Sequence, residues 1–165
     1  MKFSGALPSK AKEIKLTTFE NGHWIFPEQM AKDKSYVGFI YVIRDKVLQR
    51  YYLGKKSYAG SGKLNKGKES NWKKYTSSSK VLNELLKVRP KDEFEFICLE
   101  QYKTKGTLSY SETWSLCLVE APTNNAWYNT LIEKVSWPVK EQITARHKER
   151  LQQVIDWKTF KMEYK

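Results

Sequence analysis

The sequence concentrates its positive charge in one short stretch, from Lys55 to Lys74. Seven lysines and a single acidic residue, Glu69, give this stretch +6 of the chain's net charge of +12. Glycines and aromatic residues lie between the lysines. Ammonium groups spaced in this way can neutralise successive phosphates of a nucleic-acid backbone. A solvated basic loop is the alternative interpretation, but the pI of about 9.6 of the whole chain favours a polyanionic partner.

Two aromatic tripeptides precede all seven of these lysines. They are Phe39-Ile40-Tyr41 and Tyr52-Leu53-Gly54, and ten residues separate them. The β-branched and aromatic runs 37–43 and 51–55 predict two antiparallel strands with a turn between them. By themselves such aromatic residues are usually core residues or cross-strand pairs.

The rest of the chain predicts the elements that would position these residues. Residues 94–99 read as a third strand. Apolar residues at helical spacing after Ser77-Ser78-Ser79 predict a helix of two to three turns, and a second helix is expected from Ser109 to Val119. A long amphipathic helix is expected from Ser136 to beyond Ile155. The order indicates a small α+β fold.

Composition bounds the organisation of the chain. Hydrophobic residues make up 40% of the 165 residues, which is enough for one packed core without disulfides or a structural metal. Cys98 and Cys117 lie among apolar residues, so both are expected to be buried and reduced. No apolar run approaches the roughly 20 residues that a membrane-spanning helix needs. We therefore expect no membrane association and a cytoplasmic location, in a bacterial or phage-infected host cell.

With these elements in place, the sequence resembles the GIY-YIG nuclease family. The two tripeptides and their spacing carry the resemblance, and three later blocks match the form found in phage-encoded and homing-type members. These blocks are Trp72-Lys73-Lys74-Tyr75 with the serines that follow, Glu112 after Leu108-Ser109-Tyr110-Ser111, and Trp127-Tyr128-Asn129. The resemblance implies a three-stranded antiparallel sheet flanked by helices. It divides the chain into an N-terminal extension (1–36), a nuclease domain (37–133) and a basic C-terminal helical extension (134–165).

The chain departs from the family pattern at three positions. Phe39 stands where the family usually has Gly, and Leu53 replaces Ile. Many members carry a catalytic Arg after the second tripeptide, but this chain has none between Arg50 and Arg89. A lysine could supply the charge without the bidentate geometry of arginine. The candidates are Lys56, Lys68 and Lys73, and Asn71 stands where some members have that Arg.

The resemblance implies a metal-dependent DNA endonuclease. Glu112 would hold one divalent cation, Mg²⁺ or Mn²⁺, because a hard oxygen ligand suits such an ion. The alternative is that Ser109-Tyr110-Ser111-Glu112 forms a capping box that needs no catalysis to explain it. Tyr41 and Tyr52 would orient and deprotonate the attacking water. A free phenol has a pKa of about 10, so the metal or the adjacent lysines would have to lower the pKa of one tyrosine.

Further roles follow from the same resemblance. Lys55 and Lys56 alternate across the second strand, so one of them should point into the site. Tyr51 is expected to be a packing residue, and Asn129 either contacts the phosphate or begins a turn. The lysines expected to bind nucleic acid are Lys55, Lys63, Lys66 and Lys74, and the terminal helix could also lie on the backbone.

Double-stranded DNA is the expected partner, and the oligomeric state, monomer or homodimer, stays open. So does the biological role in homing, restriction or recombination. Two other functions remain possible from the sequence: a catalytically inactive nucleic-acid-binding module on the same fold, and an RNA-binding protein.

Overall fold

Three antiparallel strands form one sheet in the part of the chain that the structure describes. The structure is a computed structural model, and it describes residues 21–26, 35–61, 63–135 and 138–163, with side chains as far as residue 154. Strand β1 (Gly38–Asp45) lies between β2 (Arg50–Ser57) and β3 (Phe94–Tyr102), in the order β2-β1-β3. The α+β class and the small antiparallel sheet predicted from the sequence are confirmed.

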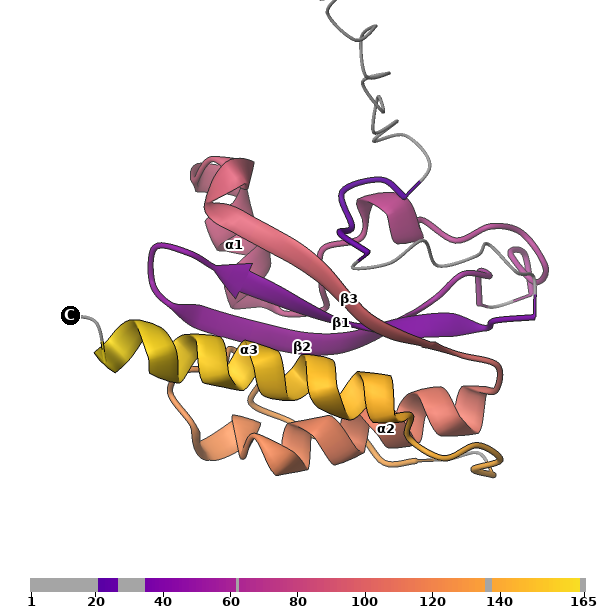
Figure 1. Ribbon diagram of the computed structural model, residues 1–165. Coiled ribbons are helices and arrows are strands. Elements are labelled where there is room, and N and C mark those ends of the chain that lie inside the picture. Colours follow the sequence, from indigo (N-terminus) through magenta and orange to yellow (C-terminus); the bar gives the residue numbers. More distant parts are fainter. Residues whose placement is uncertain (1–20, 27–34, 62, 136–137, 164–165) are drawn as a thin grey trace, which may run out of the picture.

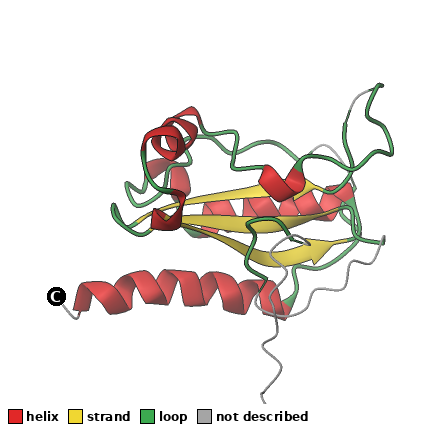
Figure 2. Cartoon of the chain, turned by 90° about the horizontal axis from the view of Figure 1, so that it is seen from above, coloured by secondary structure: helices red, strands yellow, loops and turns green. Residues whose placement is uncertain are grey.

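Helices cover both faces of this sheet (Figure 1). Helices α2 (Lys105–Leu118) and α3 (Ala145–Glu163) lie on one face. Helix α1 (Lys80–Val88) and the segment 21–26 lie on the other face. Three short 3-10 helices complete the described elements: η1 (Trp72–Lys74), η2 (Lys91–Glu93) and η3 (Ala121–Thr123). Figure 2 shows the long loops that join these elements at the two ends of the sheet.

Side chains alternate across the strands and so build two cores. Residues such as Ile40, Val42 and Leu53 pack towards α2 and α3. Their neighbours Phe39 and Tyr41 face the opposite way, where they pack with residues that include Trp24, Trp72 and Leu82. Phe39 is fully buried there, so the residue that replaces the family's glycine fills core volume.

The buried carboxylate of Asp45 ties together the end of the sheet where β1 turns into β2. It accepts the backbone N–H groups of Val47 and Leu48 at 3.0 and 2.9 Å. It also pairs with the guanidinium of Arg89 at 2.6 and 2.8 Å and accepts the hydroxyl of Tyr128 at 2.9 Å. These bonds fix the segment around Tyr128 against the sheet.

The predicted first helix is confirmed, and the second begins earlier than predicted. Ser79 caps α1 by accepting the N–H of Leu82 at 3.3 Å. Helix α2 begins at Lys105 rather than Ser109, because Thr104 caps it by accepting the N–H of Thr107 at 3.2 Å. Ser109 and Glu112 therefore lie inside the helix, and the capping-box explanation of Glu112 is wrong.

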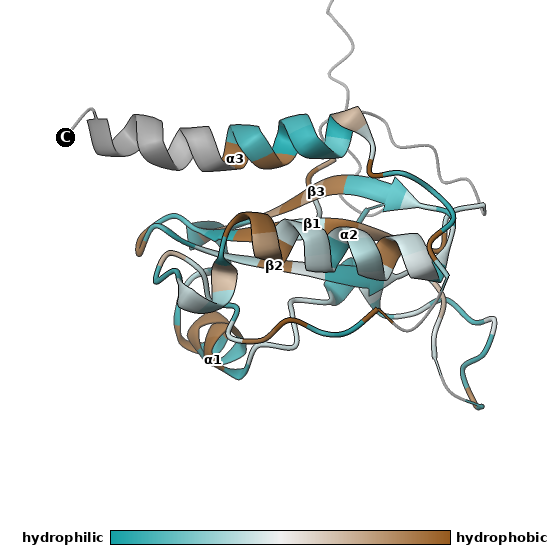
Figure 3. Cartoon of the chain, turned by 90° about the horizontal axis from the view of Figure 1, so that it is seen from below, coloured by the Kyte–Doolittle hydropathy of each residue, from teal (hydrophilic) through white to brown (hydrophobic). Residues whose placement is uncertain are grey.

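The terminal helix also differs from its prediction. Helix α3 begins at Ala145, after Thr144, whose hydroxyl accepts the N–H of His147 at 3.1 Å. The predicted start at Ser136 lies outside the described residues. The described half of α3 is largely hydrophilic, with its apolar residues confined to narrow bands (Figure 3).

Two expectations from composition can be compared with the structure. Cys98 is buried, as expected, whereas Cys117 is exposed on α2, so its expected burial is wrong. Within the described residues, no helix has the length and apolarity needed to cross a bilayer. The boundaries of the two extensions stay predictions, and residues 1–20 and 27–34 of the first lie outside the described residues.

Candidate active site

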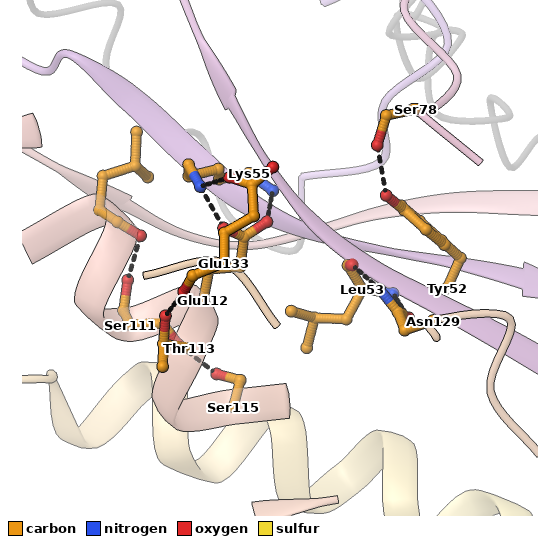
Figure 4. Close-up of polar contacts among 11 residues, drawn as sticks. Tyr52, Leu53, Lys55, Ser78, Ser111, Glu112, Thr113, Ser115, Asn129 and Glu133 are labelled. Atoms are coloured by element: carbon orange, nitrogen blue, oxygen red, sulfur yellow. Dashed lines mark hydrogen bonds and ion pairs between the residues drawn. The ribbon is translucent and has the colours of Figure 1, made fainter. Parts of the chain in front are cut away.

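The outer edge of β2 is closed by three different kinds of hydrogen-bond partner. The N–H of Tyr51 donates to the carbonyl of Ala126 at 2.8 Å. At Leu53 the amide side chain of Asn129 takes over, since its Oδ1 accepts the N–H at 2.9 Å and its Nδ2 donates to the carbonyl at 2.7 Å. At Lys55 the partner is the carboxylate of Glu112, whose Oε1 accepts the N–H at 3.1 Å. Figure 4 shows the last two arrangements side by side on the strand.

Glu112 is a largely buried acid at the end of this series. Its side chain is 13% exposed, and its Oε2 forms an ion pair with the ammonium of Lys55. Burial raises the pKa of Glu112, and the charge of Lys55 opposes that increase. The ammonium of Lys55 also lies 3.2 Å from Glu133 Oε2. Burial lowers the pKa of Lys55, but the carboxylates of Glu112 and Glu133 together outweigh this effect and raise it.

Three tyrosines gather on the other face of the hairpin. The ring centroids of Tyr41 and Tyr52 are 6.2 Å apart, and those of Tyr41 and Tyr75 are 6.3 Å apart. The hydroxyl of Tyr52 lies 3.0 Å from Ser78 Oγ (Figure 4). A Cβ atom at Gly54 would lie 2.5 Å from the hydroxyl oxygen of Tyr41, so the glycine of the second tripeptide leaves room for that hydroxyl.

The electrostatics of this group run against the expectation of an activated phenol. Burial raises the pKa of Tyr41, Tyr52 and Tyr75, and the negative charge of Glu112 contributes to the increase at each of them. Burial therefore outweighs any lowering of these pKa values by the adjacent lysines. The same result places Glu112 within electrostatic reach of all three hydroxyls, although it approaches the strand from the opposite face.

Of the three lysines considered as replacements for arginine, only Lys56 lies at the tyrosines. Its Nζ donates to Asn71 Oδ1 at 2.8 Å and lies 4.0 Å from the ring centroid of Tyr75. Burial lowers the pKa of Lys56. Lys73 pairs instead with Glu69 at 3.3 Å, and Lys68 is exposed in the loop that follows β2.

That loop also carries two of the four lysines expected to bind nucleic acid. Its two ends are joined by bonds from the N–H of Ser70 to the carbonyl of Tyr58, 2.7 Å, and from Ser70 Oγ to the carbonyl of Ser57, 2.6 Å. Lys63 and Lys66 are exposed beyond this closure, and Lys74 is exposed on η1. Lys55 is separate from them, because its ammonium is paired with carboxylates.

The segment 21–26 supports the tyrosine group from behind. Trp24 Nε1 donates to the carbonyl of Trp72 at 2.6 Å, and the ring of His23 lies 2.9 Å from the carbonyl of Tyr75. Ile25 bonds to β3 in both directions, at 2.7 Å to Phe96 and 2.9 Å from Cys98. Sequence reasoning did not identify this support, for which the only signal was the apolar run Trp24-Ile25-Phe26.

Sequence reasoning also missed Ser78 and Glu133 as neighbours of the site. It used Tyr75 only as part of a family block. The regular spacing of a strand or helix predicts none of these three positions, because each lies in a connecting segment. The site residues that the sequence did predict remain to be tested by experiment.

A divalent cation fits the chemistry of Glu112. A carboxylate is a hard oxygen donor, and this one already faces a positive charge. Among the described residues, no group of three or more His, Cys, Asp or Glu side chains could hold a metal. A sparse set of protein ligands is ordinary for Mg²⁺, which keeps several waters and takes one or two carboxylates.

Comparison with known proteins gives one match. A family model described as "Putative endonuclease segE, GIY-YIG domain" matches residues 24–132, which is 109 of the 165 residues. The match spans both tripeptides, Glu112 and Asn129. No curated protein and no solved structure matched the chain.

Proposed function

The chain belongs to the GIY-YIG endonuclease family, and from that premise we propose that it hydrolyses phosphodiester bonds of double-stranded DNA with the help of one divalent cation. The observation that carries the proposal is that Glu112, bonded at the outer edge of β2, lies near enough to Tyr41, Tyr52 and Tyr75 for its charge to raise the pKa of all three phenols. Glu112 approaches this edge from α2, and the three phenols lie on the opposite face. Lys56 adds a positive charge beside the phenols.

Glu112 is the residue that would hold the cation, Mg²⁺ or Mn²⁺. When bound, such an ion stabilises the negative charge that develops on the phosphate. The backbone bond from Lys55 to Glu112 Oε1 fixes the carboxylate without using its second oxygen. Oε2, which now faces the Lys55 ammonium, is the atom available to the ion.

Tyr41 and Tyr52 orient the attacking water. Their raised pKa values keep both phenols neutral near pH 7, so they act through hydrogen bonds unless a cation lowers one of these values. Tyr52 is the more exposed of the two, 9% against 1%, and is therefore the one placed to touch the water. Tyr41, whose ring packs with those of Tyr52 and Tyr75, holds the group in position.

Lys56 and Asn71 together take the place of the missing arginine. The ammonium supplies the charge, and the bond from Nζ to Asn71 Oδ1, 2.8 Å, gives that charge a fixed direction. Neither group alone has the fork of a guanidinium. Lys68 and Lys73, which do not reach the tyrosines, would instead join Lys63, Lys66 and Lys74 in contacting the DNA backbone.

Cleavage of supercoiled plasmid with Mg²⁺ or Mn²⁺ tests the proposal. Glu112→Gln keeps an oxygen for the Lys55 N–H but removes the charge, and Tyr52→Phe removes only a hydroxyl. We expect each to reduce the cleavage rate by about 100-fold or more while duplex binding is retained. The matched controls are Glu84→Gln, on the exposed face of α1, and Tyr51→Phe, next to Tyr52 but in the opposite core, and both should cleave like the wild type.

Two results would favour the rival functions. If the wild-type protein binds duplex DNA but does not nick it in the presence of any divalent ion tested, it is an inactive binding module. Preference for structured RNA over duplex DNA in a competition assay would indicate an RNA-binding protein.

A further inference from the structure

One lysine ammonium lies between two carboxylates that come from different segments. Lys55 Nζ pairs with Glu112 Oε2 on α2 and lies 3.2 Å from Glu133 Oε2 in the segment that follows Asn129 (Figure 4). The position of this nitrogen is therefore within contact distance of both acids. It is a position at which the fold already holds a positive charge.

The segment that carries Glu133 is attached to α2 right beside Glu112. Thr113 Oγ1 donates to the carbonyl of Glu133 at 3.0 Å, and Thr113 is the residue after Glu112. The two acids differ in exposure, 13% for the side chain of Glu112 and 79% for that of Glu133. One carboxylate thus forms the wall of the position and the other forms its solvent-facing rim.

Ion exchange at this position is physically reasonable. An ammonium is a monovalent cation on a flexible stem, and the attraction of two carboxylates for a divalent ion is larger at the same distance. Mg²⁺ is commonly bound through one or two carboxylates and keeps its remaining ligands as water or substrate phosphate. A rim carboxylate leaves the outer side of the ion open to a phosphate.

We propose that Glu133 is a second carboxylate ligand of the divalent cation held by Glu112, and that the Lys55 ammonium occupies this position until the cation displaces it. The inference rests on the proposed function, because it assumes that a divalent cation binds at Glu112. Once displaced, the Lys55 ammonium is free to contact a phosphate, which is the role expected of it from the sequence.

Binding of Mn²⁺ to the whole 165-residue chain without DNA, measured by calorimetry, tests the proposal independently of cleavage. Glu133→Gln should weaken binding by about ten-fold or more. The matched control is Glu84→Gln, which also removes an exposed carboxylate paired with a lysine, Lys87, at 2.6 Å. This control should bind like the wild type, and unchanged affinity in Glu133→Gln would overturn the proposal.

Two further variants separate a ligand from a distant charge. Glu133→Asp keeps the charge but shortens the side chain, so a true ligand should lose affinity in this variant too. Wild-type affinity in Glu133→Asp would reduce Glu133 to a long-range electrostatic role and overturn the ligand assignment. Lys55→Met should tighten Mn²⁺ binding several-fold because it removes the competing ammonium, and no gain in affinity would overturn the displacement.

Glu112→Gln distinguishes failure of this inference from failure of the proposed function. If Glu112→Gln loses Mn²⁺ and Glu133→Gln does not, the cation stays at Glu112 and only the second ligand is wrong. If Glu112→Gln binds like the wild type, the cation site of the proposed function is itself wrong. Thermal unfolding of each variant checks that the fold is intact.

Discussion

The carboxylate of Glu112 bonds to both the backbone and the side chain of Lys55. Oε1 accepts the N–H at 3.1 Å, and Oε2 faces the ammonium. The first bond is one of those that close the outer edge of β2. Through it, strand β2 fixes the position of Glu112, although Glu112 belongs to helix α2. A helix that shifted along the sheet would break this bond, and the acid would lose its place relative to the tyrosines on the other side.

Asn129 sets the neighbouring step of that edge, and Asn129→Asp should destabilise the fold. Aspartate cannot donate to the carbonyl of Leu53, and it would place a buried negative charge against that oxygen. We expect the free energy of unfolding to fall by about 3 kcal/mol, measured by urea denaturation. Asn125→Asp makes the same chemical change at an exposed position and should leave it unchanged. Lost cleavage with unchanged stability would instead assign Asn129 to the phosphate.

Lys56→Met should reduce the turnover rate more than Lys68→Met or Lys73→Met does. The contacts of Lys56 with Asn71 and the Tyr75 ring place its charge at the phenols. We expect kcat for plasmid cleavage to fall by about 100-fold, as for loss of one electrostatic contact to the transition state. Lys68→Met and Lys73→Met should mainly raise KM, because their ammonium groups lie away from the tyrosines. An equal loss of kcat in either variant would contradict the assignment.

The sequence could predict the hairpin, and it gave reason to propose a role for Glu112, but it could not predict where the helix that carries Glu112 begins. Both Thr104 and Ser109 stand where a cap could form, and Gly106 between them disfavours a helix through residues 105–108. In the fold Gly106 is buried within α2, and packing outweighs its low helix propensity.

Local sequence patterns could not predict the contacts between segments that are distant in the sequence. Ile25 pairs with Ile97, and Lys56 meets Asn71 only because bonds from Ser70 close the loop between them. Strand alternation predicts that Lys55 and Lys56 point to opposite faces, but not that each one contacts a different half of the site. No periodicity could have identified Glu133, which is exposed in a connecting segment.

Lys63, Lys66 and Lys74 should each contribute to the salt dependence of DNA binding. If each neutralises one phosphate, changing one of them to methionine should reduce the slope of log affinity against log salt by about 0.9. Fluorescence anisotropy with a short duplex at several salt concentrations, without divalent ions, measures this slope. Lys87→Met, on the exposed side of α1, removes the same charge and should leave the slope unchanged. If the slope is the same as in the wild type for all three variants, the DNA binds to another surface.

His147 should make the fold sensitive to acid. Ser115 Oγ donates to the carbonyl of Ser111 at 2.7 Å, so it must accept from Nε2–H of His147, and Nδ1 then accepts the hydroxyl of Tyr102 at 2.8 Å. This arrangement needs a neutral ring. Burial lowers the pKa of His147 to about 4, from 6.5, despite the nearby charge of Glu100.

Between these two pKa values the unfolded chain binds a proton that the folded chain does not. The stability that the neutral His147 ring contributes is therefore fully present above pH 6.5. As the pH falls towards 4, the free energy of unfolding decreases by up to about 3 kcal/mol from this residue. The pKa of His23 is also lowered to about 4, by burial first and then by Lys91. His23 therefore lowers the stability over the same pH range as His147. His147→Gln offers an amide donor and acceptor that do not titrate, so urea denaturation between pH 7 and pH 4.5 should show a smaller loss than in the wild type. Equal losses in the two proteins would mean that His147 is not the titrating group.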